Sequence, residues 1–212
     1  KFSFDKIINS FAKQEIDILI GTQMITKGLD FKNIGLVGVI NTDHFLNFPD
    51  FRAHEKAFQT LTQVAGRSGR SGDRGKVFMQ TYQPDHPIIK NVIENDYEKM
   101  YKNQLLERKD YNYPPFVRLI RITIKDKSYE KLNSSGDWLN RVIRDNYKGI
   151  VLGPVYPEIS RIKNKYHKQF LIKLRNLDEL NRFRSIFQKI QKSFDSISKY
   201  RSVRIIVDVD PI

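Results

Sequence analysis

Two adjacent prolines, Pro114 and Pro115, constrain this chain more than any other feature. Proline lacks a backbone donor and restrains the residue before it, so neither a helix nor a central strand continues through the pair. We therefore expect a domain boundary here, with one domain over residues 1–115 and a second over residues 116–212. A chain of 212 residues is long enough for two ordinary domains.

The part before the prolines alternates between helical and strand patterns. Apolar residues at helical spacing predict helices over residues 2–13, from Phe51 through the Gln63 segment with Asp50 as its cap, and over residues 87–108. Short apolar runs predict buried strands at residues 17–20, 35–40 and 76–81. Strands that are apolar on both faces and alternate with helices are typical of an α/β layer with a parallel sheet.

The part after the prolines has a different order. Strands are predicted at residues 117–125, 150–159, 169–174 and 203–209, and helices at residues 129–147 and 180–194. The resulting order β-α-β-β-α-β is that of the ferredoxin-like split unit, an α+β domain. Trp138 lies beside the apolar stripe of the first of these helices, so we expect it to pack in the core.

The net charge of +13 belongs almost entirely to the second part. Residues 1–115 hold 16 Lys and Arg against 14 Asp and Glu, whereas residues 116–212 hold 21 against 10. This asymmetry indicates a polyanionic partner for the second part, with nucleic acid as the leading candidate. The alternative is a lysine-rich surface without a dedicated partner.

One basic run stands out between the second and third strands of the second domain. Residues 161–168 contain four cations around Tyr166, and we expect them on a hairpin. The cations are Arg161, Lys163, Lys165 and Lys168. Such a hairpin could hold a DNA backbone, with the aromatic ring as a stacking partner. The alternative is a solvated loop.

Several classes of site are disfavoured by composition. The chain has no Cys, which excludes disulfides and thiolate metal sites, and its four His show no ligand spacing, so we expect no metal site in it. We find no leader and no apolar run long enough to cross a bilayer. We expect a cytoplasmic fragment of a longer protein.

Two polar motifs follow predicted elements of the first domain. Gly21-Thr22-Gln23-Met24, then Lys27-Gly28-Leu29-Asp30-Phe31, comes directly after a predicted strand, where ligands collect in parallel sheets. The second motif runs from Gln63 to Arg70 and carries two arginines three residues apart, whose guanidinium groups suit phosphate oxygens. Taken singly, the first could be a glycine turn and the second a basic surface loop.

Together the two motifs resemble motifs V and VI of superfamily 2 helicases. Residues 46–53, 75–86, 113–116 and 208–211 resemble the PriA (primosomal protein N-prime) family within that superfamily, and the resemblance covers almost the whole chain. It implies a truncated RecA-like second helicase lobe followed by the ferredoxin-like domain. Thr26, Leu29 and Ser68 depart from the usual pattern without altering a charged group.

The resemblance also implies roles for individual residues. Arg67 and Arg70 would be catalytic, reaching the γ-phosphate of an ATP held by another lobe. Residues for ATP binding and coupling would be Gln63, Gly66, Gly28 and Asp30. Contacts to the DNA backbone would come from Thr22 and Gln23, whereas Lys27 is either a further contact or a solvated charge.

The resemblance implies a helicase that moves 3′ to 5′ on DNA and restarts stalled forks. ATP and Mg²⁺ would bind mainly to a first lobe, and zinc would bind to cysteines elsewhere in the full-length protein. This sequence has no phosphate loop of the Gly-x-x-x-x-Gly-Lys-Ser/Thr type, so we expect the chain alone not to hydrolyse ATP.

The implied partners are single-stranded and forked DNA, single-stranded DNA-binding protein and primosome loader proteins. A monomer is expected, and no membrane. Two alternatives remain at this point: another superfamily 2 motor, or a nucleic-acid-binding module without catalysis.

Overall fold

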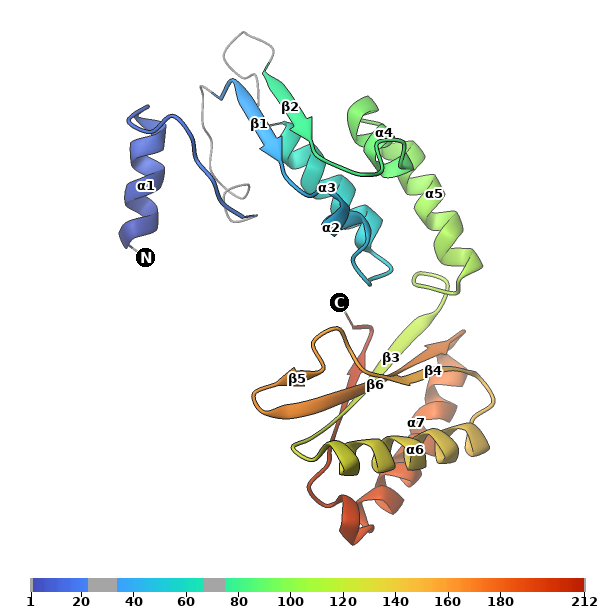
Figure 1. Cartoon of the computed structure of the whole chain (residues 1–212). Coiled ribbons are helices and arrows are strands. Elements are labelled where there is room, and N and C mark those ends of the chain that lie inside the picture. Colours follow the sequence, from blue (N-terminus) through green and yellow to red (C-terminus); the bar gives the residue numbers. More distant parts are fainter. Residues whose placement is uncertain (1, 23–33, 67–74, 212) are drawn as a thin grey trace. The chain divides into compact units, whose positions relative to one another are not determined.

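The computed structural model describes residues 2–22, 34–66 and 75–211. The chain forms two compact units, Lys1–Leu106 and Glu107–Ile212, each described by itself below (Figure 1). The division between the units falls within one helix, ahead of the proline pair. The expected domains, residues 1–115 and 116–212, therefore stay a prediction. Among the described residues, no helix is both long and apolar enough to cross a membrane.

The first unit is an α/β layer. Its elements are α1 (Phe2–Ala12), β1 (Leu36–Val39), α2 (Asp43–Leu46), α3 (Ala53–Ala65), β2 (Lys76–Met79), α4 (Pro87–Glu94) and α5 (Tyr97–Asp110). β1 and β2 pair in parallel, with Val37 opposite Val77, which confirms the predicted parallel pairing of these two strands. The helices α2 to α5 supply a core in which Phe58, Leu61 and Ile88 are buried.

The burial predicted for these strands is only half right. Val39 and Met79 pack against the helical core, but Leu36 and Phe78, which point the other way, are exposed. Successive side chains of a strand alternate between faces, and the core of described helices lies on one face only. An apolar sequence therefore did not ensure burial on both sides.

The strand predicted at residues 17–20 is wrong. This segment has no strand conformation, and Ile18 and Ile20 are exposed. A strand is stabilised by the ladder it makes with a neighbour, and no described strand pairs with this run. A short apolar run cannot by itself establish that a partner strand is present.

The long helix predicted over residues 87–108 is broken into α4 and α5. Asn95 ends α4 in the left-handed region, at φ 55°. Asp96 follows and accepts a hydrogen bond from the backbone N of Lys99 at 2.9 Å through Oδ1. Asn tolerates left-handed backbone and Asp is a strong N-cap, so the pair ends one helix and begins the next.

The helix predicted after Asp50 is present as α3, but it begins at Ala53. Asp50 does not cap it from the expected position. Its Oδ1 accepts from the backbone N of Arg52 at 2.9 Å, and its Oδ2 pairs with Lys56 at 2.6 Å. The aspartate therefore closes a turn just before the helix and is joined to the helix by an ion pair.

The second unit has the predicted ferredoxin-like topology. Its elements are β3 (Arg118–Asp126), α6 (Tyr129–Asn146), β4 (Ile150–Val155), β5 (Arg161–Ile162), β6 (Lys165–Leu174), α7 (Leu177–Asp195), the 3₁₀ helix η2 (Ser198–Tyr200) and β7 (Arg204–Val209). The sheet runs β4-β6-β3-β7 with antiparallel neighbours, and β5 pairs with β6.

Both long helices of this unit cover the same face of the sheet (Figure 1). Ile122 of β3, Leu139 of α6 and Phe183 of α7 belong to one buried core. Trp138 packs against that core, with its ring 5.7 Å from that of Phe194, as predicted. The other face of the sheet carries no helix, so side chains that point there are free to form a surface.

The segment after α5 closes one end of this helix-free face. Lys173 of β6 is buried, and its Nζ donates to the carbonyl oxygen of Tyr111 at 2.6 Å. The same ammonium lies 3.6 Å from the ring centroid of Tyr113. Burial lowers the pKa of Lys173. The buried ammonium of Lys173 thus joins the segment after α5 to β6.

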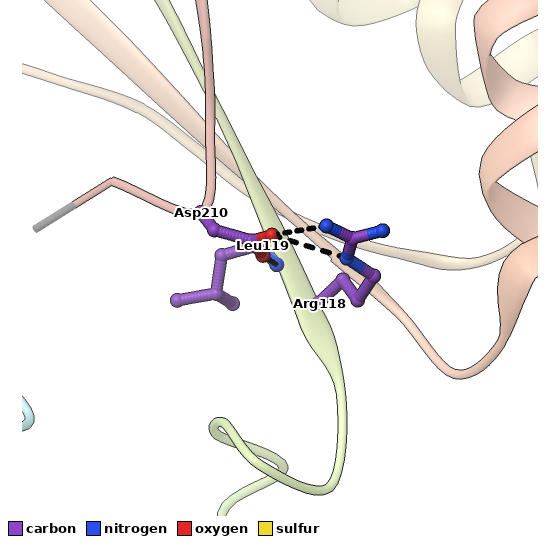
Figure 2. Close-up of polar contacts among 3 residues, drawn as sticks. All are labelled: Arg118, Leu119 and Asp210. Atoms are coloured by element: carbon purple, nitrogen blue, oxygen red, sulfur yellow. Dashed lines mark hydrogen bonds and ion pairs between the residues drawn. The ribbon is translucent and has the colours of Figure 1, made fainter.

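The last strand is fastened to β3 by Asp210 (Figure 2). Asp210 Oδ2 accepts from Nη2 and Nε of Arg118 at 2.6 and 3.1 Å, and Oδ1 accepts from the backbone N of Leu119 at 3.2 Å. Its own backbone N donates to the carbonyl of Leu119 at 2.8 Å. Asp210 therefore has the hydrogen-bonding role expected of a carboxylate at a strand end.

Candidate functional site

The helicase-like residues predicted in the first unit divide into two groups. Thr22, Gln63 and Gly66 are described by the structure. The others lie outside the described residues: Gln23, Lys27, Gly28, Asp30, Arg67 and Arg70. Thr22 is exposed on non-helical backbone. Gln63 lies in the last turn of α3, and the backbone N of Gly66 donates to Thr62 O at 2.9 Å to close that helix.

Gln63 faces an open cavity of about 560 Å³. His44, Phe45 and Phe48 form one wall. The side from α3 carries the ammonium of Lys56 and the side-chain amides of Gln59 and Gln63. The Lys56 ammonium is paired with Asp50 at 2.6 Å and Gln59 Nε2 donates to Glu55 Oε1 at 3.4 Å, so these two donors are already engaged.

The carboxyl ends of β1 and β2 meet at Asp43. Its Oδ1 accepts from Thr81 Oγ1 at 2.8 Å, and its Oδ2 accepts from the backbone N of Tyr82 at 3.0 Å. These bonds, led by that from Tyr82, lower the pKa of Asp43. Because both oxygens are engaged, Asp43 braces the carboxyl ends of β1 and β2.

The basic run in the second unit does form a hairpin, as predicted. Lys163 and Asn164 make the turn between β5 and β6, with positive φ values of 47° and 62°. Two consecutive positive φ values are the signature of the tight turn that suits the twist of paired strands. The turn places Arg161 opposite Tyr166 and Ile162 opposite Lys165.

Strand alternation separates the four predicted cations. Residues directly opposite share a face, so Arg161 lies with Tyr166 on the side of the helices, and Lys165 lies on the helix-free side. Lys163 is exposed in the turn. Lys168 is only 9% exposed and holds its Nζ 5.0 Å from the ring centroid of Tyr156. The four do not form one row.

The helix-free face carries a row of basic residues that the sequence pattern did not predict. His167 of β6 is directly opposite Lys125 of β3, which is directly opposite Arg204 of β7. Lys165 lies on the same face two residues from His167 along β6, and Arg121 lies on it four residues from Lys125 along β3. We call these five residues the basic sheet face. These residues occupy alternate positions of their strands, but the grouping emerges only when the strands are aligned.

The electrostatics of His167 reflect this grouping. Its pKa is lowered, first by partial burial and then by the positive charges of Lys125 and Lys165. Repulsion of this kind favours a neutral imidazole at neutral pH. A polyanion bound at the basic sheet face would relieve the repulsion.

The described residues hold no group of three or more His, Asp and Glu side chains that could bind a metal ion. The cations of the second unit suit anionic groups.

Comparison with known proteins gives two family matches. Residues 3–72 match the helicase conserved C-terminal domain, which is a RecA-like lobe. Residues 109–212 match the primosomal protein N C-terminal domain. The two matches cover parts of both compact units.

Individual relatives are similar over nearly the whole chain. "Replication restart protein PriA" of Bacillus subtilis is 36% identical over 213 residues, which cover 100% of this chain and 26% of the relative. The protein of the same name from Chlamydia muridarum is 40% identical over 212 residues, or 99% of this chain and 27% of the relative. The chain spans about a quarter of the length of these relatives.

Proposed function

Because the chain belongs to the PriA family of replication restart proteins, we propose that it is the C-terminal part of an ATP-dependent DNA helicase. The full-length protein would move 3′ to 5′ on DNA, recognise stalled forks and restart replication. The single observation that carries the DNA-binding part of this proposal is the basic sheet face. A row of basic side chains across three strands, on the face without helices, suits a phosphate backbone.

In the motor, we assign Arg67 and Arg70 to the γ-phosphate of ATP, which a separate lobe would hold together with Mg²⁺. Gln63 and Gly66, at the end of α3, would set the position of the segment that carries these arginines. ATP hydrolysis would supply the free energy for movement. Guanidinium groups neutralise the charge that develops on the phosphate, an effect of about 10³–10⁵ in rate in other phosphate-transferring systems.

The first motif would hold the DNA track. Thr22 and Gln23 would donate to phosphate oxygens, Lys27 would add a charge, and Gly28 and Asp30 would couple this contact to the nucleotide. Two features support this assignment: residues 3–72 match the helicase conserved C-terminal domain, and Thr22 is exposed.

In the second unit, the basic residues of the hairpin and the basic sheet face would bind single-stranded or forked DNA. Arg161, Lys163 and Lys165 would make the hairpin contacts. We assign Lys168 the smallest share, because it is buried against Tyr156. We further propose that single-stranded DNA-binding protein and primosome loader proteins are partners, that zinc binds outside this chain, and that the protein acts as a cytoplasmic monomer.

The salt dependence of DNA binding tests this proposal. We expect Arg161→Gln, Lys163→Gln and Lys165→Gln together to weaken binding of a single-stranded oligonucleotide. The slope of log affinity against log salt should fall in magnitude by about 2, since each lost phosphate contact removes about 0.7. Lys125→Gln with Arg204→Gln should reduce it by about 1. Fluorescence anisotropy from low to moderate salt gives both slopes.

A matched control carries the same change in net charge elsewhere. Arg184, Lys189 and Lys192 are exposed on α7, on the side of the unit away from the basic sheet face. Replacing these three by Gln should leave the slope nearly unchanged. Equal effects of the control and the hairpin variant would mean that net charge alone governs binding, and the assignment of the surface would be wrong.

A further inference from the structure

Three tyrosines gather beside the hairpin on the helix-covered side of the second unit. Tyr129 begins α6, Tyr156 follows β4, and Tyr166 lies in β6. The rings of Tyr129 and Tyr156 are stacked, with centroids 5.9 Å apart and an interplanar angle of 4°. Tyr166 meets Tyr129 edge-on at 5.5 Å and 75°. We call Tyr129 and Tyr156 the tyrosine pair.

The tyrosine pair is held rigidly but remains accessible. Tyr129 is 53% exposed and Tyr156 is 37% exposed, whereas Tyr147 and Tyr200 of the same unit are buried in its core. Tyr156 Oη donates to Asn133 Oδ1 at 2.5 Å, and the buried ammonium of Lys168 lies 5.0 Å from the Tyr156 ring. A ring fixed in this way loses little conformational entropy when a second ring stacks on it.

A cation lies next to Tyr166, which meets the tyrosine pair edge-on. The guanidinium carbon of Arg161 is 5.1 Å from the Tyr166 centroid, and Nη2 of Arg161 donates to Asn164 Oδ1 in the turn. Lys163 is the exposed neighbour in that turn. An accessible aromatic face flanked by fixed positive charge is the combination that binds unpaired bases together with their phosphates.

We propose that the tyrosine pair is a stacking platform for one unpaired base of single-stranded DNA, with Arg161 and Lys163 binding the adjacent phosphates. The inference rests on the proposed DNA-binding role of the second unit and adds a site for a base to it. Duplex DNA keeps its bases stacked inside the helix, so the platform distinguishes single strands from duplex. Stacking does not depend on the identity of the base, so sequence preference should be weak.

The test compares Tyr129→Ala with Tyr129→Phe in the 212-residue chain. The probe is a labelled oligo-dT and a matched oligonucleotide of the same length with abasic sites. We expect Tyr129→Ala to lower the affinity for oligo-dT about tenfold, the order expected for one base–aromatic stack, and Tyr129→Phe to change it less than about twofold. The salt slope should be the same in both variants, because no phosphate contact is removed.

The abasic probe makes the result independent of any folding defect. Wild type should bind it about tenfold more weakly than oligo-dT, whereas Tyr129→Ala should bind the two probes equally. Tyr82→Ala, at an exposed tyrosine of the first unit, is the matched control and should behave as wild type. Equal wild-type affinity for both probes, or an undiminished preference for oligo-dT in Tyr129→Ala, would overturn the platform.

Failure of the broader proposal is recognised separately. If neutralising Arg161, Lys163 and Lys165 leaves the salt slope unchanged, the hairpin does not bind phosphates and its DNA-binding assignment is overturned. The basic sheet face is judged separately by Lys125→Gln with Arg204→Gln. If that slope falls but Tyr129→Ala binds oligo-dT as tightly as wild type, the backbone contacts stand and only the stacking platform is wrong.

Discussion

Among single residues of the second unit, Asp210 has a clear role in the stability of the fold. Hydrogen bonds from Arg118, ahead of that from Leu119, lower the pKa of Asp210 in the folded state. A carboxylate with a lowered folded pKa contributes stability above its unfolded pKa, and this contribution is lost as pH falls through the folded pKa. Asp210 therefore fastens β7 to β3 mainly when it is ionised.

We expect Asp210→Asn to lower the free energy of unfolding by up to about 1 kcal/mol at pH 7, since the ion pair is partly exposed. The difference from wild type should shrink as pH falls below about 4, the ordinary range of an Asp carboxyl. Urea unfolding at several pH values measures both effects. Asp208→Asn, at an exposed carboxylate on the same strand, serves as the control; a constant difference across pH would contradict the role given to Asp210.

At the residue scale, the sequence identified a basic run in the second unit but did not predict which basic residues share a face of the sheet. The run from Arg161 to Lys168 contains the cations, yet their distribution between two faces depends on the positive φ values of Lys163 and Asn164. His167, Lys125 and Arg204 come from three strands that are far apart in sequence. Only the register brings them into one row, and register is a tertiary property.

Whole elements were predicted well where a long periodic pattern existed. The stripe through Leu132, Leu139 and Ile143 became α6, and the alternation after Val203 became β7. The elements that were predicted wrongly were short, or their ends depended on the conformation of a single residue. The apolar run at residues 17–20 lacks a partner strand among the described residues, and the break between α4 and α5 depends on the conformation of one residue, Asn95.

The break between α4 and α5 gives a prediction about stability. Asn95 adopts φ 55°, which costs a residue with a Cβ about 1 kcal/mol unless its side chain compensates. We expect Asn95→Ala to lower the free energy of unfolding by about 1 kcal/mol and Asn95→Gly to be within about 0.5 kcal/mol of wild type. Urea denaturation followed by circular dichroism compares the two. A larger loss for Gly than for Ala would show that the side chain of Asn95, and not its backbone conformation, is what matters.

At the scale of the whole molecule, we expect this chain to supply only part of the ATP site and the rest of a longer protein to supply the remainder. Relatives are about four times its length, and its sequence contains two candidate arginines but no phosphate loop. The sequence motifs alone indicated this arrangement. Arg67 and Arg70 lie outside the described residues, so their role stays a prediction.

We therefore expect the 212-residue chain to show no DNA-stimulated ATP hydrolysis. In the full-length protein, Arg70→Lys should lower turnover by a factor on the order of 10³ or more while ATP binding is largely kept, because lysine lacks the planar fork. Steady-state phosphate release and binding of a labelled ATP analogue separate the two effects. Lys102→Gln, on the exposed surface of α5, should leave both unchanged. Measurable turnover by the isolated chain would refute this expectation.

The number of residues in the turn at Lys163 and Asn164 determines which side chains of β5 face Tyr166. One extra residue would shift β5 by one residue relative to β6, so that Ile162 would take the place of Arg161 beside Tyr166. Two extra residues would restore the original facing. Odd and even changes in the length of this turn should therefore differ in kind: the odd ones exchange a charged neighbour of the aromatic ring for an aliphatic one, and the even ones only lengthen the tip.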